Sequence, residues 1–357
     1  MSNRVHSFLE LMVQQGGSDL HLVSGMPPCI RMNGALHRVR FRDLSIEDVE
    51  QILAEFMTDT QRHDLGQRLS VDFGYEDPEL GRFRVNAYRH VRGTAAAFRF
   101  VPPSPGSLEA LGLPNAVRIH THQPKGLTLV TGPTGSGKST TLAAMVDLVN
   151  QTRRGHIITI EDPIEFVHEH KGCVVTQREI GIHAPSFSEA LRHALREDPD
   201  VILIGELRDM ETVALALTAA ETGIQVFGTL HTSGATRTVD RIVNVFPARR
   251  QEQIRSMLAD SLRLIVSQQL VRKADGSGRV LVAEVLVNTH AASSMIRTGN
   301  AHKLESVIQS GGQSGMQSLD ATLKDLVRRQ VIAADEAYAH ALDKAAFERL
   351  VVAREAA

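Results

Sequence analysis

The nine residues GPTGSGKST, at positions 132–140, have the types and spacing that suit phosphate chemistry. They match the pattern GxxxxGK[ST] and lie between a predicted strand and a predicted helix. Glycines let successive backbone N–H groups point at a phosphate, Lys138 supplies a positive charge to the β and γ phosphates, and the Ser139 hydroxyl suits Mg²⁺. A glycine-rich turn that binds nothing is the alternative, which this context disfavours. We therefore predict a nucleoside triphosphate site formed by Gly132, Pro133, Thr134, Gly135, Ser136, Gly137, Lys138, Ser139 and Thr140.

Acidic residues follow two other apolar runs, where a phosphate site needs a carboxylate. In VILIGELRD, residues 201–209, a run typical of a strand buried on both faces ends at Glu206, and an ionised carboxylate is costly there unless something pairs with it. We expect Glu206 to act on Mg²⁺ and on the attacking water. The second cluster, ITIEDPIE, holds Glu161, Asp162 and Glu165. The sequence leaves open how Glu161 and Glu206 divide the roles of base and metal shell, and a solvated loop carboxylate is the alternative for each.

A histidine follows a third apolar run. His231, in GTLHTSGA, is the last residue of the predicted strand 225–231. The carboxyl ends of parallel strands meet at one edge of a sheet, so His231 is expected to reach the nucleotide as a γ-phosphate sensor or a hydrogen-bond relay. A structural role is the alternative for a single histidine.

The elements that position these residues alternate between strands and helices. Strands are predicted at 126–132, 156–162, 200–207 and 225–231, with helices between them, which is the signature of a parallel, doubly wound α/β sheet. Ser186 and Glu189 have the spacing of a capping box before one of these helices. Beyond residue 235 we expect mostly helix, with one further strand at 279–287.

The first hundred residues have a different pattern. They predict a helix at 4–15, a helical stretch at 46–57, and strands at 19–23, 28–36, 70–77, 81–90 and 93–101. This indicates a smaller α+β domain with antiparallel pairing. The segment VPPSPGSLEALGLP is rich in proline and glycine and cannot sustain a regular element. We therefore predict an N-terminal domain at 1–100, a linker at 101–114 and a domain with the nucleoside triphosphate site at 115–357.

The composition is that of an ordinary globular protein, with 357 residues, 42% hydrophobic and 22% charged. A formal net charge of −2 argues against a dedicated nucleic-acid binder. The two cysteines, Cys29 and Cys173, form no CxxC pair, so a zinc knuckle or disulfide framework is not expected. No secretory signal or apolar run of roughly 20 residues is present, so we expect a cytoplasmic protein.

These motifs, in this order, resemble the type IV pilus retraction ATPases, the PilT family of the secretion ATPase superfamily. The phosphate loop is shared by many families, but TIEDPIEF with DPDVILIGELRD and GTLHT is specific. The resemblance also covers SDLHL and GMPP at 18–28, RFRVNAYRHVRGTAAAFR at 82–99 and GMQSLDATLKDLV near the end. In that family the Asp box, Walker B and His box correspond here to Glu161–Glu165, Glu206 and His231.

The resemblance implies a PAS-like N-terminal domain joined to a RecA-like ATPase domain, assembled as a homo-hexameric ring. It implies ATP hydrolysis with Mg²⁺ that powers pilus retraction and twitching motility, through a platform protein at the inner membrane. Such a ring would associate peripherally with that membrane, with a paralogous pilus ATPase as a further partner and no nucleic acid. The family's N-terminal arginines correspond to Arg82, Arg84 and Arg99, which are suited to neutralising a transferring phosphoryl group. One solvated face of a sheet is the alternative for these arginines.

Two departures from the family pattern leave a choice open. The family's AIRNLIRE segment is AASSMIRT here, at 291–298, which keeps Ile296 and Arg297 but lacks the terminal glutamate, and Asn33 stands where an acidic residue is usual. An accessory paralogue is therefore an alternative to the main retraction motor. A pilus-assembly or type II secretion ATPase, a DNA translocase and a non-hydrolysing scaffold are further alternatives. The first is disfavoured by the absence of a four-cysteine motif, and the second by the absence of a basic stripe.

Overall fold

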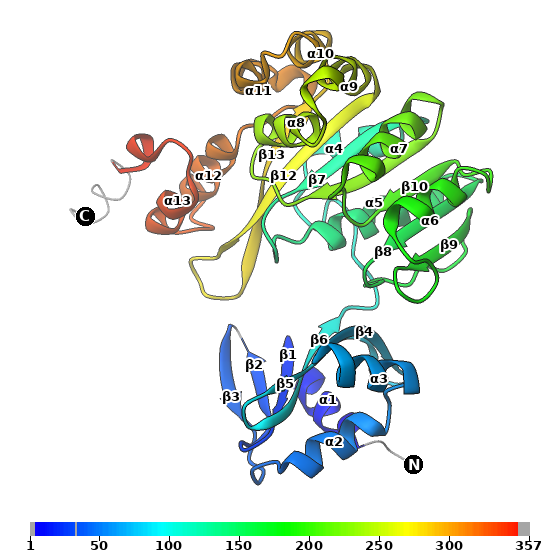
Figure 1. The fold of residues 1–357 in the computed structure, drawn as a ribbon. Helices are drawn as coiled ribbons and strands as arrows, with labels where there is room; N and C mark the ends of the chain where they lie inside the picture. Colours follow the sequence, from blue (N-terminus) through cyan, green and yellow to red (C-terminus); the bar gives the residue numbers. More distant parts are fainter. Residues whose placement is uncertain (1–3, 33, 349–357) are drawn as a thin grey trace. The chain divides into compact units, whose positions relative to one another are not determined.

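The computed structural model describes residues 4–32 and 34–348, so Asn33 lies outside the described residues. Its contacts divide the chain into two compact units. Unit 1 comprises residues up to Ser104 together with Pro163–Val167, and unit 2 comprises Pro105–Asp162 and the chain from His168 onward (Figure 1). The limits predicted from the sequence, with a linker at 101–114, stay a prediction.

Over its described residues, unit 1 is an antiparallel sheet of six strands in the order β3-β2-β1-β6-β5-β4, with three helices. Its core holds Phe73, Phe83 and Phe98, together with Val5 and Leu9 from the first helix. Ser45 and Thr58 begin the second and third helices with capping boxes, which satisfy their first free N–H groups. The elements are β1 Asp19–Val23, β2 Cys29–Met32, β3 Ala35–Arg38, β4 Ser70–Asp77, β5 Gly81–His90, β6 Gly93–Val101, α1 Arg4–Gln14, α2 Ile46–Ala54 and α3 Asp59–Arg68.

The single strand predicted at 28–36 is wrong. The chain instead forms the pair β2 and β3, with Met32 opposite Ala35 and Gly34 at φ 88° between them. Glycine accepts this left-handed conformation without strain, so it supplies the tight connection. The helix α3 was also missed, because DTQRHDLGQR carries only one buried apolar side chain, Leu65, and so has no apolar period.

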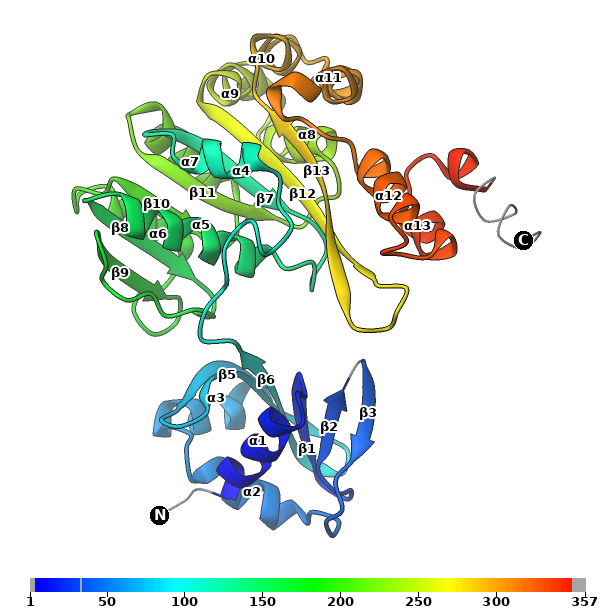
Figure 2. The ribbon, with the colours of Figure 1, turned by 180° about the vertical axis from the view of Figure 1, so that it is seen from behind.

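Unit 2 contains a sheet of seven strands in the order β13-β12-β7-β11-β10-β8-β9. All neighbouring pairs are parallel except β12 and β13, which are antiparallel. The views from the two sides show α4 (Asn115–Thr121) and α5 (Lys138–Thr152) on one face and α6 (Phe187–Ala194) and α7 (Met210–Glu221) on the other (Figures 1 and 2). The strands are β7 Gly126–Thr131, β8 His156–Glu161, β9 Val174–Glu179, β10 Val201–Ile204, β11 Gln225–Leu230, β12 Leu262–Arg272 and β13 Arg279–Val287.

The central strands β7, β10 and β11 are buried along their whole length. Helices cover both faces of such strands, so the side chains on both faces are apolar. The strands therefore show continuous apolar runs in the sequence, without the alternation of polar and apolar residues. The helices are α4 Asn115–Thr121, α5 Lys138–Thr152, α6 Phe187–Ala194, α7 Met210–Glu221, α8 Ala235–Asn244, α9 Ala248–Ser261, α10 His290–Arg297, α11 Leu304–Ser310, α12 Leu319–Arg328 and α13 Ala334–His340.

The expectation of mostly helix beyond residue 235 missed β12. The strand at 279–287 is present as β13, and it pairs over nine register positions with the eleven-residue β12. In LRLIVSQQLVR the apolar run is interrupted by Ser267, Gln268 and Gln269, which conceals the strand. Beyond these polar residues, Val271 and Val282 pack with α12 and α13 in a small separate core.

Each unit carries one free thiol. Cys29 lies on β2 in unit 1, and Cys173 lies just before β9 in unit 2. Both are buried, and burial raises the pKa of each thiol. Among residues 4–32 and 34–348, no helix is both long and apolar enough to cross a membrane.

Candidate nucleotide-binding site

The loop between β7 and α5 is held in a shape that only glycines allow at three positions. Gly132, Gly135 and Gly137 have φ values of 142°, 79° and 86°. A Cβ on Gly132 would also lie 2.2 Å from the carbonyl oxygen of Gln268, so a side chain there would displace the backbone. The N-terminus of α5 follows directly. Its N-cap residue is Gly137, which has no side chain that could cap the helix. Its first N–H groups are therefore arranged to bind an anion.

Lys138 and Ser136 present their polar groups inside this loop. The Lys138 side chain is buried, and its Nζ donates to the carbonyl oxygens of Gly132 and Pro133, each at 3.0 Å. The Ser136 hydroxyl is buried with no hydrogen-bond partner among the described residues. A buried hydroxyl without a partner is costly, and a phosphate oxygen would satisfy it. The loop thus fits a phosphate group.

Gln268 on β12 fixes the loop from the adjacent strand. Its Nε2 donates to the Ser136 carbonyl oxygen at 2.8 Å, and its Oε1 accepts from the Thr141 hydroxyl at 3.0 Å. The side chain is fully buried, so these bonds are shielded from water. Sequence reasoning missed Gln268, because a glutamine about 130 positions from its partners leaves no local pattern that could have indicated it.

Glu206 follows the buried strand β10 and is held from both sides. The Gly205 N–H donates to the Ile160 carbonyl oxygen at 2.7 Å, and a Cβ at Gly205 would lie 3.2 Å from that oxygen. The Thr229 hydroxyl donates to the Gly205 carbonyl oxygen, and the Leu207 N–H donates to the Thr229 carbonyl oxygen. The backbone on each side of Glu206 is therefore fixed to its neighbouring strands.

The structure brings the three predicted strand-end residues together. His231 Nε2 lies 3.3 Å from Glu206 Oε2, and His231 Nδ1 lies 3.5 Å from Lys138 Nζ. An ammonium can only donate, so Nδ1 is the acceptor and Nε2 carries the proton that faces the carboxylate. Their strands β7, β11 and β10 are neighbours in the sheet. The catalytic roles assigned to these residues stay a prediction.

Arg208 also contacts Glu206, so that Lys138, His231, Glu206 and Arg208 form one row of contacting side chains. Its guanidinium lies 2.6 Å from Glu206 Oε2, and sequence reasoning did not single it out. Burial acts to raise the pKa of Glu206, but the hydrogen bond from Arg208 and the nearby His231 outweigh it and lower that pKa. Glu206 is therefore ionised at neutral pH and can accept a proton or bind a cation.

The three acidic residues of the second cluster, Glu161, Asp162 and Glu165, do not all belong to the same unit. Glu161 ends β8 and accepts from the Thr159 hydroxyl at 2.7 Å and from Gln177 Nε2 at 3.3 Å. Asp162 is close enough to Arg208 to contribute to the raised pKa of that guanidinium, after Glu206. Glu165 belongs to unit 1, where its carboxylate lies 3.5 Å from Arg84.

The three arginines share one face of the unit 1 sheet. Arg82 and Arg84 alternate with buried Phe83 and Val85 along β5, and Arg84 lies opposite Arg99 on β6. Arg99 Nε donates to Asp19 at 2.9 Å, and Arg82 Nε donates to the Ile164 carbonyl oxygen at 3.1 Å. The clustering agrees with a shared role, but their place in a nucleotide site stays a prediction.

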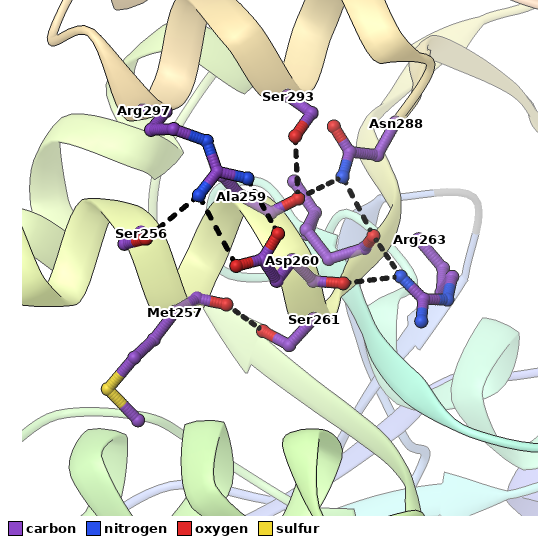
Figure 3. Close-up of polar contacts among 10 residues, drawn as sticks. Ser256, Met257, Ala259, Asp260, Ser261, Arg263, Asn288, Ser293 and Arg297 are labelled. Atoms are coloured by element: carbon purple, nitrogen blue, oxygen red, sulfur yellow. Dashed lines mark hydrogen bonds and ion pairs between the residues drawn. The ribbon is translucent and has the colours of Figure 1, made fainter.

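The segment AASSMIRT lies on and just beyond α10. Ile296 is fully buried. Arg297 bonds to Asp260 at 2.6 Å and to the Ser256 hydroxyl at 2.8 Å, so it fastens α10 to α9 (Figure 3). Thr298, where the family has glutamate, is the C-cap of this helix.

The site fits a nucleotide with Mg²⁺ by the chemistry of its donors. The loop offers N–H groups, an ammonium and a buried hydroxyl to phosphates, while Ser139 in the first turn of α5 and the ionised Glu206 supply the oxygen ligands that Mg²⁺ prefers. A parallel sheet with this loop after one strand and a carboxylate after a neighbouring strand defines a P-loop nucleotide-binding protein.

The chain belongs to the type II/IV secretion system protein family, whose model matches residues 2–338. It is 50% identical over 333 residues to the type IV pilus retractation ATPase PilT of Pseudomonas aeruginosa, covering 93% of this chain and 96% of that one. It is 41% identical over 344 residues to the type IV pilus ATPase PilU of the same species, covering 96% and 90%. These matches confirm the predicted resemblance.

A solved structure supports the same assignment. The crystal structure of the pilus retraction motor PilT with bound ADP superposes with a TM-score of 0.88 at 43% identity, covering 96% of this chain and 98% of that one. The predicted fold class, an α/β domain with a parallel sheet preceded by a smaller α+β domain, is confirmed by this likeness and by the sheet topology.

Proposed function

We propose that this protein is an ATPase that powers type IV pilus retraction. The observation that carries the proposal is the row formed by Lys138, His231, Glu206 and Arg208, on three neighbouring strand ends, in a chain so similar to retraction ATPases. The higher identity to PilT than to PilU favours a main retraction motor over an accessory paralogue. We further propose a homo-hexameric ring in the cytoplasm, acting on a platform protein of the inner membrane.

The residues of unit 2 divide the chemistry as follows. The loop N–H groups and Lys138 bind and neutralise the β and γ phosphates of ATP. Ser139 and Glu206 would hold Mg²⁺, which when bound would supply further charge neutralisation at the phosphates. Glu206, ionised and oriented by His231 Nε2–H, accepts a hydrogen bond from the attacking water, and Glu161 shares the acidic roles. In-line attack needs positioning more than covalent help, and the fixed backbone at Glu206 provides that positioning.

The arginines of unit 1 supply the link from chemistry to work. We propose that Arg82, Arg84 and Arg99 stabilise the phosphates in one arrangement of the ring and not in another. ATP then favours the first arrangement by its differential affinity, and hydrolysis removes that bias. Repeated around the ring, this cycle would turn the platform protein and release pilins from the fibre.

Replacing Lys138 tests the nucleotide site directly. Lys138→Ala removes the ammonium from the loop, so we expect ATP affinity to fall by at least about 100-fold, equivalent to about 2.7 kcal/mol, and phosphate release to become undetectable. Calorimetric titration with ATP and a phosphate-release assay measure the two effects. Lys125→Ala, which changes a lysine just before β7, is the control for loss of a positive charge. Unchanged ATP affinity in the Lys138 variant would remove it from the site.

Retraction itself is tested in a piliated host. Deleting the gene should stop the retraction of fluorescently labelled pili, and the wild-type gene should restore it, whereas Lys138→Ala should not. Retraction that continues at the normal rate after deletion would show that another chain is the main motor.

A further inference from the structure

Glu284 is a buried carboxyl that the proposed chemistry does not use. It lies on β13, directly opposite Ser267 on β12, and only 7% of its surface is exposed. Burial raises the pKa of Glu284, nearby Glu305 and Asp320 raise it further, and only the bond from the Ala235 N–H opposes them. Burying a carboxyl in such surroundings is unfavourable, so the groups to which it is hydrogen-bonded indicate its role.

Those bonds converge on the beginning of α8. Glu284 Oε1 accepts from the Ala235 N–H at 2.7 Å, and the Ser267 hydroxyl oxygen accepts from the Gly234 N–H at 2.7 Å. The N-cap residue is Gly234, which has no side chain of its own to cap the helix. Two opposed residues of β12 and β13 thus do the work of a cap from another part of the fold.

The capped end lies three residues after His231. Thr238, on the first turn of α8, donates to the Gly234 carbonyl oxygen at 2.8 Å and lies 2.8 Å from the Thr232 hydroxyl. Its hydroxyl also lies 3.5 Å from that of Thr131, the last residue before the phosphate loop. The segment His231–Gly234 is therefore fixed at its far end by the capping bonds and in its middle by Thr238.

We infer that Glu284 and Ser267 are positioning residues that hold the α8 N-terminus and thereby aim His231 at Glu206 and Lys138. Gln268, the next residue on β12, fixes the phosphate loop instead. Adjacent side chains of one strand thus hold two different loops of the site, one that binds the phosphates and one that bears His231. This inference rests on the proposed ATPase activity.

The separation of the two loops predicts different kinetic effects. Glu284→Ala should lower kcat about tenfold while changing the KM for ATP by less than about twofold, because nucleotide binding stays with the other loop. Glu284→Gln keeps an oxygen that can accept from Ala235, so it should stay within about threefold of wild type. Gln268→Ala should chiefly raise KM. A larger effect of Glu284→Ala on KM than on kcat would overturn the inference.

A double-mutant cycle with His231 separates positioning from general stabilisation. If Glu284 acts through His231, Glu284→Ala should change kcat less than about twofold in a His231→Ala background. Val282→Ala, on the same strand but facing the separate core with α12 and α13, is the matched control and should leave kcat within about twofold of wild type. An equal loss from Glu284→Ala in both backgrounds would refute the inference.

Two further measurements keep the outcomes distinct. Should Glu284→Ala fail to fold, Ser267→Ala removes only the Gly234 acceptor, and it should lower kcat about threefold in wild type and not in His231→Ala. Phosphate release by the wild-type chain is measured first. A wild type without ATPase activity refutes the proposed function, whereas an active wild type with unaffected Glu284 and Ser267 variants refutes only the positioning role.

Discussion

Glu206 is an ionised carboxylate at the end of a buried strand, and two neighbours offset the cost of that position. Arg208 and His231 both contact Oε2, and together they lower the pKa that burial would raise. The same contacts orient the carboxylate toward the phosphate loop through the link from His231 to Lys138. Pairing and orientation therefore come from the same side chains.

Glu206→Gln should separate binding from hydrolysis. The amide keeps the size of the side chain but neither attracts Mg²⁺ as strongly nor accepts a proton, so we expect phosphate release to fall by about 100-fold or more while ATP still binds. Steady-state assays and ATP titration measure the two. Glu211→Gln, an exposed carboxylate nearby on α7, is the matched control and should have little effect. Turnover near that of wild type would show that Glu206 is not the essential carboxylate.

At the scale of elements, the sequence best predicts the strands and helices that have a regular local pattern of apolar residues. The buried strands β7, β10 and β11 have continuous apolar runs, so their ends, and with them Lys138, Glu206 and His231, could be found. The strand β12 could not be found in this way, because polar residues that bond to distant parts of the fold interrupt its apolar run. Gln268 and Glu284 bond to residues far away along the chain, and no local period records such a contact.

The element α1 is joined to the unit 1 sheet by a bond that depends on pH. His6 Nδ1 lies 2.7 Å from Asp77 Oδ2 at the end of β4, and this hydrogen bond raises the pKa of His6. Burial acts to raise the pKa of Asp77, but the bonds from His6 and from the Glu79 and Leu80 N–H groups lower it. The pair is therefore charged on both sides in mildly acidic solution.

His6→Ala should destabilise unit 1 more at pH 6 than at pH 8.5. A raised histidine pKa gives stability that is fully present below the unfolded value of about 6.5 and is lost as the pH rises through the folded value. We expect a loss of about 1 kcal/mol at pH 6 and less at pH 8.5. Two of the three tyrosines, Tyr75 and Tyr88, lie in unit 1, so tyrosine fluorescence during thermal unfolding follows it.

The control for this measurement is His63→Ala, which removes an exposed imidazole on α3. A destabilisation by His6→Ala that is equal at both pH values, or larger at pH 8.5, would contradict the assigned pairing.

At the scale of the whole molecule, the proposed chemistry needs groups from both units. The phosphate loop, Glu206 and His231 belong to unit 2, and the three arginines belong to unit 1. In a ring the two sets can come from different chains, since each subunit presents different surfaces to its two neighbours. Sharing of sites between chains is tested by mixing two variants, each of which lacks one of the two sets.

Mixing two inactive variants provides that test. Arg84→Ala subunits keep Glu206, and Glu206→Gln subunits keep Arg84, so assembling them together should restore up to about a quarter of the wild-type activity if each site takes one residue from each chain. Phosphate release is measured over a series of mixing ratios. Mixtures that stay as inactive as the separate variants at every ratio would contradict shared sites.

The two buried thiols give each unit its own chemical reporter. A thiol reagent attacks the thiolate, which is disfavoured at both positions, and only 5% of Cys29 and 4% of Cys173 is exposed. Labelling of Cys29 therefore measures how often unit 1 opens, and labelling of Cys173 measures the same for unit 2. Peptide mapping after one exposure to reagent would yield both opening rates from the unmodified natural chain, with and without ATP.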